Sequence, residues 1–172
     1  MNLELICRSC SRCCKKWTVP LVESDIENIK VALNSINLHG FVWVGHLMEM
    51  EINRYNDENT WCRNLKGMVI YQLKKKENND CIFWDEQNKC RIYDSRPSCC
   101  RIFPYWEGNE ELVFDVSASH VSCDIELLNH KLSGNEEFEM LNRIDKFRKE
   151  LEHVVRMLNR KSINPTFPIL KN

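Results

Sequence analysis

The 172-residue sequence lacks any apolar run long enough to cross a lipid bilayer. Its longest candidate, Phe41 to Met50, is interrupted by Gly45 and His46. Residues 1–10 contain the acidic Glu4 and lack the basic-then-apolar order of a secretory signal. We therefore expect a cytoplasmic protein that does not insert directly into a membrane.

An excess of charge of either sign is also absent. The chain has 24 Lys and Arg residues against 25 Asp and Glu residues, which gives a formal net charge of −1. Such a chain has no overall positive field to attract nucleic acid. A Gly-rich phosphate loop, a Ser/His/Asp order and a His-Glu-x-x-His motif are missing as well. We therefore expect no nucleic-acid partner and select no catalytic residue, so the sequence favours a non-enzyme over an enzyme.

The composition is otherwise that of an ordinary globular chain. Hydrophobic residues make up 43% and charged residues 28%, and 172 residues are enough to bury one core. The sequence contains no internal repeat, low-complexity tract or linker. We therefore predict a single domain over residues 1–172.

Helical periodicity is present in two segments. The run from Ser24 to Glu27 (SDIE) has the Ser-x-x-Glu order of a capping box, and apolar residues then recur at spacings of three and four. This pattern predicts a helix from about 24 to 36. After Gly134, a longer amphipathic pattern predicts a C-terminal helix over about 135–160. We interpret its apolar face as core, with docking of a partner as the alternative.

Strand signals occupy the middle of the sequence. Residues 41–52 and 67–73 are rich in β-branched, aromatic and aliphatic side chains, and they predict the two strands of a hairpin with a long connection. Shorter strands bounded by turn residues are predicted at 81–84, 90–93 and 112–116. Together these elements predict an α+β fold, with short antiparallel strands around a small loop-rich centre and a long C-terminal helix.

Cysteine is the residue present in unusual number. The chain has ten: Cys7, Cys10, Cys13, Cys14, Cys62, Cys81, Cys90, Cys99, Cys100 and Cys123. In a chain without a secretory signal this density favours metal ligation, because cytosolic thiols are kept reduced. A disulfide framework is the alternative, although neighbouring cysteines make poor independent bridges.

The first cysteines have the spacing of a cluster-binding loop. Cys7-x-x-Cys10-x-x-Cys13 is the arrangement by which ferredoxin-like loops bind three corners of a cubic iron–sulfur cluster. Structural zinc sites usually combine two Cys-x-x-Cys knuckles, and a second knuckle is absent from this sequence. The spacing therefore favours iron–sulfur, with zinc as the alternative.

Cys14 indicates a second centre. Adjacent side chains diverge in helices and in strands, so Cys13 and Cys14 are poorly placed to serve one compact centre. Two [4Fe-4S] clusters would need eight thiolates. The ligands that we predict are Cys7, Cys10, Cys13, Cys14, Cys81, Cys90, Cys100 and Cys123. We interpret the remaining Cys62 and Cys99 as small buried apolar residues, with ligation as the alternative.

The cysteine pattern resembles the CxxCxxCC, or YkgJ, cysteine-cluster family, described as zinc- or iron-chelating domains. The residues that carry the resemblance are Cys7-x-x-Cys10-x-x-Cys13-Cys14, Cys81-Ile82-Phe83, Cys90-Arg91-Ile92-Tyr93 and Arg96-Pro97-x-x-Cys100-Arg101-x-Phe103-Pro104. With Cys123 they define a family-like core over residues 7–123. The resemblance implies a metal-cluster centre in this core, and Cys62 and Cys99 match no position of the shared pattern.

Two arginines flank one of the predicted ligands. Arg96 and Arg101 lie on either side of Cys100 in the sequence, and Pro97 can open a short helical turn whose free amides would face the cluster sulfurs. A cubic cluster with four thiolates is an anion. We therefore predict that both arginines contact the cofactor and shift its potential. Pairing of Arg96 with a nearby acidic residue is the alternative.

These observations predict an iron–sulfur protein that acts as an accessory, electron-transfer or redox- and oxygen-sensing partner of a larger enzyme complex. The resemblance implies an anaerobic setting, with one-carbon or methyl-transfer metabolism as a host for that complex. A zinc-binding structural or metal-trafficking protein is the first alternative. A methyltransferase-associated enzyme is the second, because flagellin lysine methylases look like carriers of the same cysteine pattern.

Overall fold

The computed structural model confirms the predicted α+β fold class. The residues that it describes are 12–16, 18–34, 37–46, 68–87, 89–108, 111–114 and 132–161. The short helices in these ranges include α2 (Arg12–Lys16), the 3₁₀ helix η1 (Leu38–Gly40) and α5 (Ser98–Ile102). No helix within these ranges combines the length and apolar character needed to cross a membrane.

The largest sheet in the described residues is antiparallel and has the strand order β1-β3-β2. Its strands are β1 (Pro20–Leu21), β2 (Val42–His46) and β3 (Val69–Leu73). The register of β2 against β3 runs from the Val42–Leu73 pair to the His46–Val69 pair. β3 is therefore the central strand and is hydrogen-bonded on both sides.

The long hairpin predicted from residues 41–52 and 67–73 is confirmed in β2 and β3. The part predicted at 47–52 lies outside the described residues. β1 is absent from the predicted strands, because a strand of two residues is too short to show a period of two.

Two smaller antiparallel hairpins follow the sheet in the chain. Their strands are β4 (Trp84–Asp85), β5 (Lys89–Cys90), β6 (Tyr105–Gly108) and β7 (Glu111–Phe114). The strand predicted at 112–116 is confirmed up to residue 114 in β7, and residues 115–116 lie outside the described residues. Of the strand predicted at 81–84, only Trp84 belongs to a strand, β4. The strand predicted at 90–93 is wrong beyond its first residue, because the chain turns there into the 3₁₀ helix η4 (Tyr93–Ser95).

α3 (Glu23–Leu33) confirms the first predicted helix, but its start is built differently. The predicted capping box of Ser24 and Glu27 is wrong. Val22 is the N-cap, and the Asp25 carboxylate accepts a hydrogen bond from the Val22 N–H at 3.3 Å. Asp25 therefore has the capping role that the sequence pattern assigned to Glu27.

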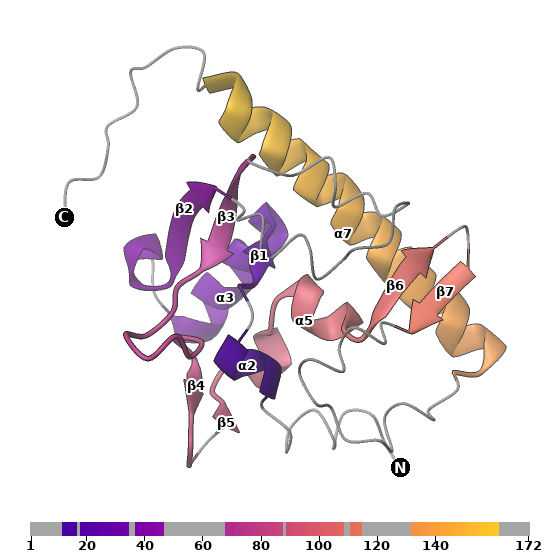
Figure 1. Ribbon diagram of the computed structural model, residues 1–172, viewed down its shortest axis with the longest axis horizontal. Coiled ribbons are helices and arrows are strands. Elements are labelled where there is room, and N and C mark those ends of the chain that lie inside the picture. Colours follow the sequence, from indigo (N-terminus) through magenta and orange to yellow (C-terminus); the bar gives the residue numbers. More distant parts are fainter. Residues whose placement is uncertain are drawn as a thin grey trace.

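α7 (Gly134–Lys161) confirms the predicted C-terminal helix. Its start is capped because the Ser133 N–H and hydroxyl each donate to Glu136 Oε2 at 2.8 Å. The buried side chains of α7 are Met140, Ile144, Phe147, Leu151, Val154 and Val155. α7 packs against β3, α5 and β6, and it lies along one side of the molecule from the three-stranded sheet to the β6–β7 hairpin (Figure 1). The prediction that its apolar face belongs to the core is confirmed.

Candidate metal centre

Cysteines reach one region of the molecule from three separate segments. α2 carries Cys13 and Cys14, the β4–β5 region carries Cys81 and Cys90, and α5 carries Cys99 and Cys100. Each of these six residues is a thiol and not part of a disulfide. α2 lies between the β4–β5 hairpin and α5 (Figure 1). The fold therefore gathers residues that are far apart in the sequence.

Main-chain hydrogen bonds fix Cys81 relative to α2. The Cys81 N–H donates to the Cys14 carbonyl at 2.6 Å. The Trp84 N–H donates to the Cys81 carbonyl at 3.0 Å, which closes a turn at the start of β4. An isolated antiparallel bridge also pairs Cys81 with Lys75. The position of the Cys81 thiol is thus set by backbone contacts.

Cys81 is buried beside two other thiols. Burial is the main reason that the pKa of its thiol is raised from 9.0 to about 11, and the neighbouring Cys90 and Cys13 add to the rise. Backbone N–H groups of Phe83 and Trp84 donate to the Cys81 sulfur and act in the opposite direction on this pKa. Without a cation, this thiol therefore keeps its proton at neutral pH.

Cys100 is the second thiol whose pKa is raised. Burial raises this pKa well above 9.0. Neighbouring thiols raise it further, in decreasing order Cys99, Cys13, Cys81 and Cys90. By exposed surface area the residue as a whole is half-buried.

Four of the predicted metal ligands are therefore electrostatic neighbours. They are Cys13, Cys81, Cys90 and Cys100. Cys14 is half-buried and joins this group through its carbonyl. In the part of the chain that the structure describes, no three His, Cys, Asp or Glu side chains are arranged to hold a single metal ion. The predicted ligands Cys7, Cys10 and Cys123 lie outside the described residues.

Of the two cysteines interpreted as buried apolar residues, the structure describes only one. Cys99 is 1% exposed and lies in the hydrophobic core, as predicted. Cys62 lies outside the described residues, so its interpretation stays a prediction.

The two arginines predicted to contact the cofactor make well-defined contacts with the protein. Arg101 Nε donates to the Arg96 carbonyl at 2.9 Å, and Arg101 Nη2 donates to the Asp94 carbonyl. The Arg96 guanidinium lies 4.0 Å from the centroid of the Tyr93 ring. These contacts fasten η4 to α5. Contact of either arginine with a metal centre stays a prediction.

The first amide of α5 does not face a sulfur atom. The Ser98 N–H donates to the Asp25 carboxylate at 2.8 Å. The prediction that the free amides of this turn face the cluster is therefore wrong for Ser98. The reason is a buried carboxylate on α3, which comes from 73 residues away in the sequence.

Trp84 is buried next to the cysteines and has an unused donor. It is the cross-strand partner of Cys90 in β4–β5, and the Lys15 ammonium lies 4.3 Å from the centroid of its ring. Trp84 Nε1 is buried and, among the described residues, has no hydrogen-bond partner. Buried donors normally have an acceptor, and a metal-bound thiolate or sulfide would supply one. These surroundings therefore fit an anionic metal centre.

The motifs that supply these cysteines belong to a known pattern. The model of the CxxCxxCC family, described as a zinc- or iron-chelating domain, matches residues 6–124. The chain belongs to this family. Its CxxCxxCC domain is a metal-chelating one, it contains every cysteine gathered here, and it leaves α7 outside the matched residues. No solved structure matches the chain.

Proposed function

We propose that this CxxCxxCC domain binds iron as [4Fe-4S] clusters and serves as an accessory, electron-transfer or oxygen-sensing partner of a larger enzyme complex. The observation that carries the proposal is the mutual proximity of Cys13, Cys81, Cys90 and Cys100, which come from three segments. Four thiolates are the ligand set of one cubic cluster.

A bound metal would favour the thiolate forms of these cysteines, which the metal-free protein disfavours. Burial and neighbouring thiols oppose the charged forms of Cys81 and Cys100 and raise the pKa of each. Iron bound to the thiolates would compensate their charge, because metal ligation favours the deprotonated form. The N–H groups of Phe83 and Trp84 that point at the Cys81 sulfur would then support a metal-bound thiolate. Lys15 adds a positive charge nearby.

The other predicted ligands suffice for a second cluster. Cys7, Cys10, Cys14 and Cys123 supply four more thiolates. In two-cluster ferredoxins, cysteines of one sequence run ligate different clusters. In our proposal Cys13 binds the cluster shared with the described thiols. This differs from the loop spacing, which predicts that Cys13 shares a cluster with Cys7 and Cys10. Cys14 binds the second cluster.

Zinc is the second candidate, because the family description names zinc beside iron. The four described thiols would have to draw closer together to hold a single zinc ion. A closed site of four cysteines is typical of structural zinc. The domain would then be a structural or metal-trafficking protein. The two candidates differ in a measurable way, because a zinc site contains no inorganic sulfide.

The proposed partner would approach the cysteine-bearing side of the molecule. The apolar face of α7 is buried in the core and is not available for docking. Cys13, Cys14 and Cys90 are only half-buried, so α2 and β5 bring the proposed centre near the surface. A redox partner, such as a methyl-transfer enzyme, would exchange electrons with the centre there.

The test is metal and sulfide analysis of the full chain purified without oxygen. The proposal predicts a brown protein with about eight iron and eight sulfide per chain, as two cubic clusters require. Stoichiometric zinc without sulfide would establish the second candidate and reject the first.

A further inference from the structure

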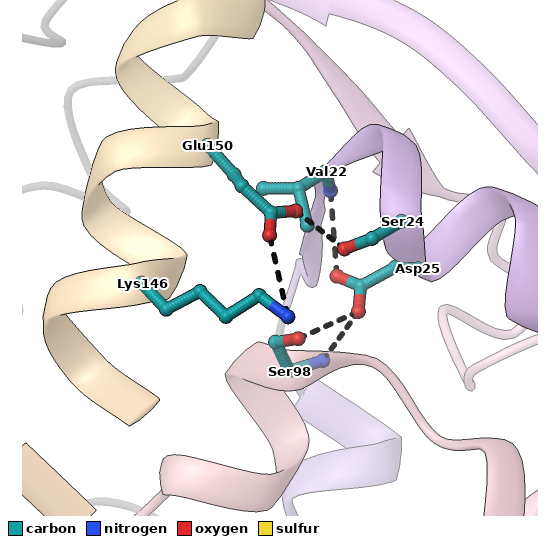
Figure 2. A network of polar contacts seen from close by, with 6 residues as sticks. All are labelled: Val22, Ser24, Asp25, Ser98, Lys146 and Glu150. Carbon is teal, nitrogen blue, oxygen red and sulfur yellow. Dashed lines mark hydrogen bonds and ion pairs between the residues drawn. The ribbon is translucent and has the colours of Figure 1, made fainter. Parts of the chain in front are cut away.

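A buried carboxylate connects the proposed centre to the rest of the fold. Asp25 is 3% exposed, and its two oxygens accept three hydrogen bonds. Oδ1 accepts from the Ser98 N–H and the Ser98 hydroxyl, each at 2.8 Å. Oδ2 accepts from the Val22 N–H at 3.3 Å. One side chain therefore caps the first turns of both α3 and α5 (Figure 2).

α5 depends on such outside contacts. It has five residues, Ser98–Ile102, and a helix of this length has little stability of its own. Cys99 and Cys100 directly follow the residue that Asp25 holds. The two bonds from Asp25 to Ser98 therefore restrain the turn from which the Cys100 thiol projects.

Asp25 is itself held on a braced helix. The hydroxyl of the adjacent Ser24 donates to Glu150 on α7, and Glu150 lies 3.8 Å from the Lys146 ammonium (Figure 2). α3, α5 and α7 thus meet at this group of polar side chains. A movement of α3 would be transmitted to α5 through Asp25.

Burial of this carboxylate is costly on its own. Desolvation raises the pKa of Asp25 and the negative charge of Glu150 adds to the rise, whereas the bonds from Ser98 and Val22 lower it. An apolar residue at this position would avoid the desolvation cost. What a carboxylate provides at this position, and an apolar residue cannot, is therefore the three hydrogen bonds that it accepts from Val22 and Ser98.

We propose that Asp25 is a positioning residue for the metal centre, because it fixes the first turn of α5 and thereby the place of Cys100 relative to Cys13, Cys81 and Cys90. This inference rests on the proposed role of Cys100 as a ligand. Asp25 acts through Ser98 and does not itself touch the metal.

The main test compares Asp25→Ala, Asp25→Asn and the control Asp145→Asn in the full chain. Asp145 is a carboxylate on α7 whose partners are Arg148 and Lys149. Competition with a chelator measures metal retention, and electron paramagnetic resonance of the reduced protein reports the cluster's surroundings. We expect about 10- to 100-fold weaker retention for Asp25→Ala, the range seen when a residue that orients a ligand is lost.

Asp25→Asn keeps one acceptor oxygen for Ser98 and should give an intermediate loss with a partly restored spectrum. The control should match the wild type. Unchanged retention and an unchanged spectrum in Asp25→Ala would overturn the proposal. If Asp25→Ala does not fold, Ser98→Ala removes only the hydroxyl bond and should show a smaller loss in the same direction.

A second measurement is independent of metal identity. In the chelator-treated full chain, mass spectrometry gives the alkylation rate of Cys100 relative to that of Cys90. This ratio should rise in Asp25→Ala and stay unchanged in Asp145→Asn. A wild type without bound metal would reject the proposed function and, with it, the metal role of Asp25. An unchanged alkylation ratio in a protein that does bind metal would reject the positioning role alone.

Discussion

The long helix α7 and the cysteine-bearing segments are held in place by different interactions. α7 has 28 residues and buries a continuous apolar face against β3, α5 and β6. In contrast, α2 and α5 have five residues each, and the strands β4 and β5 have two each. These short pieces contribute a few buried side chains to the core, such as Trp84 and Ile102, and are otherwise connected by single main-chain bonds and polar side chains. From this comparison we expect α7 to depend mainly on apolar burial and the cysteine-bearing segments to depend also on bound metal.

The largest effect is expected for Phe147→Ala in α7. Phe147 is 1% exposed, and loss of a buried aromatic ring leaves a cavity that lowers the free energy of unfolding by about 3–5 kcal/mol. Denaturant unfolding followed by circular dichroism measures this change. The matched control is Phe138→Ala, because Phe138 is 67% exposed on the same helix, and its effect should stay within about 0.5 kcal/mol. Equal losses at the two positions would refute the assignment of this face to the core.

Removal of metal should affect the two regions unequally. We expect amide hydrogen exchange in α2, β4–β5 and α5 to accelerate roughly tenfold or more after anoxic treatment with a chelator, because metal binding and local folding are coupled. Exchange in the middle of α7 should change much less. Mass spectrometry of the exchanged chain gives both rates. A uniform acceleration across the chain would show that the division between the regions does not exist.

A smaller expected effect is the release of protons from the cysteine thiols when metal binds. The pKa of Cys81 is raised to about 11 and that of Cys100 well above 9.0, so both thiols are protonated at pH 7 in the metal-free chain. A bound metal must displace these protons, so affinity falls as pH falls and about one proton leaves per ligating thiol. Zinc calorimetry in two buffers of different ionisation enthalpy counts them. A four-thiol site should release about four protons, and a release near zero would exclude thiolate ligation.

The elements that could be predicted from the sequence are the ones with a long periodic pattern. α7 and the β2–β3 hairpin repeat their apolar spacing often enough to be recognised. β1 and η4 are too short for that. The capping box was misplaced because Ser24 and Glu27 satisfy the local pattern, while the partner that makes Asp25 important, Ser98, is 73 residues away.

Of the candidate site, too, the sequence could predict only the part that lies in local motifs. Motif spacing and the family resemblance were enough to predict metal chelation, which the family match confirms. Spacing alone could not group Cys13 with Cys81, Cys90 and Cys100, because tertiary contacts bring their segments together. It also could not find Asp25 or the buried Trp84 donor, because neither residue belongs to a recognisable motif.

The most direct test of the central claim is the metal content of single Cys→Ser variants, purified without oxygen from the full chain. The account predicts that the variants of Cys13, Cys81, Cys90 and Cys100 each lose the same fraction of bound metal, about four irons per chain if the centre is one cubic cluster. Cys62→Ser is the matched control and should retain the wild-type content. Full metal retention by any of the four, or an equal loss in Cys62→Ser, would contradict the proposed centre.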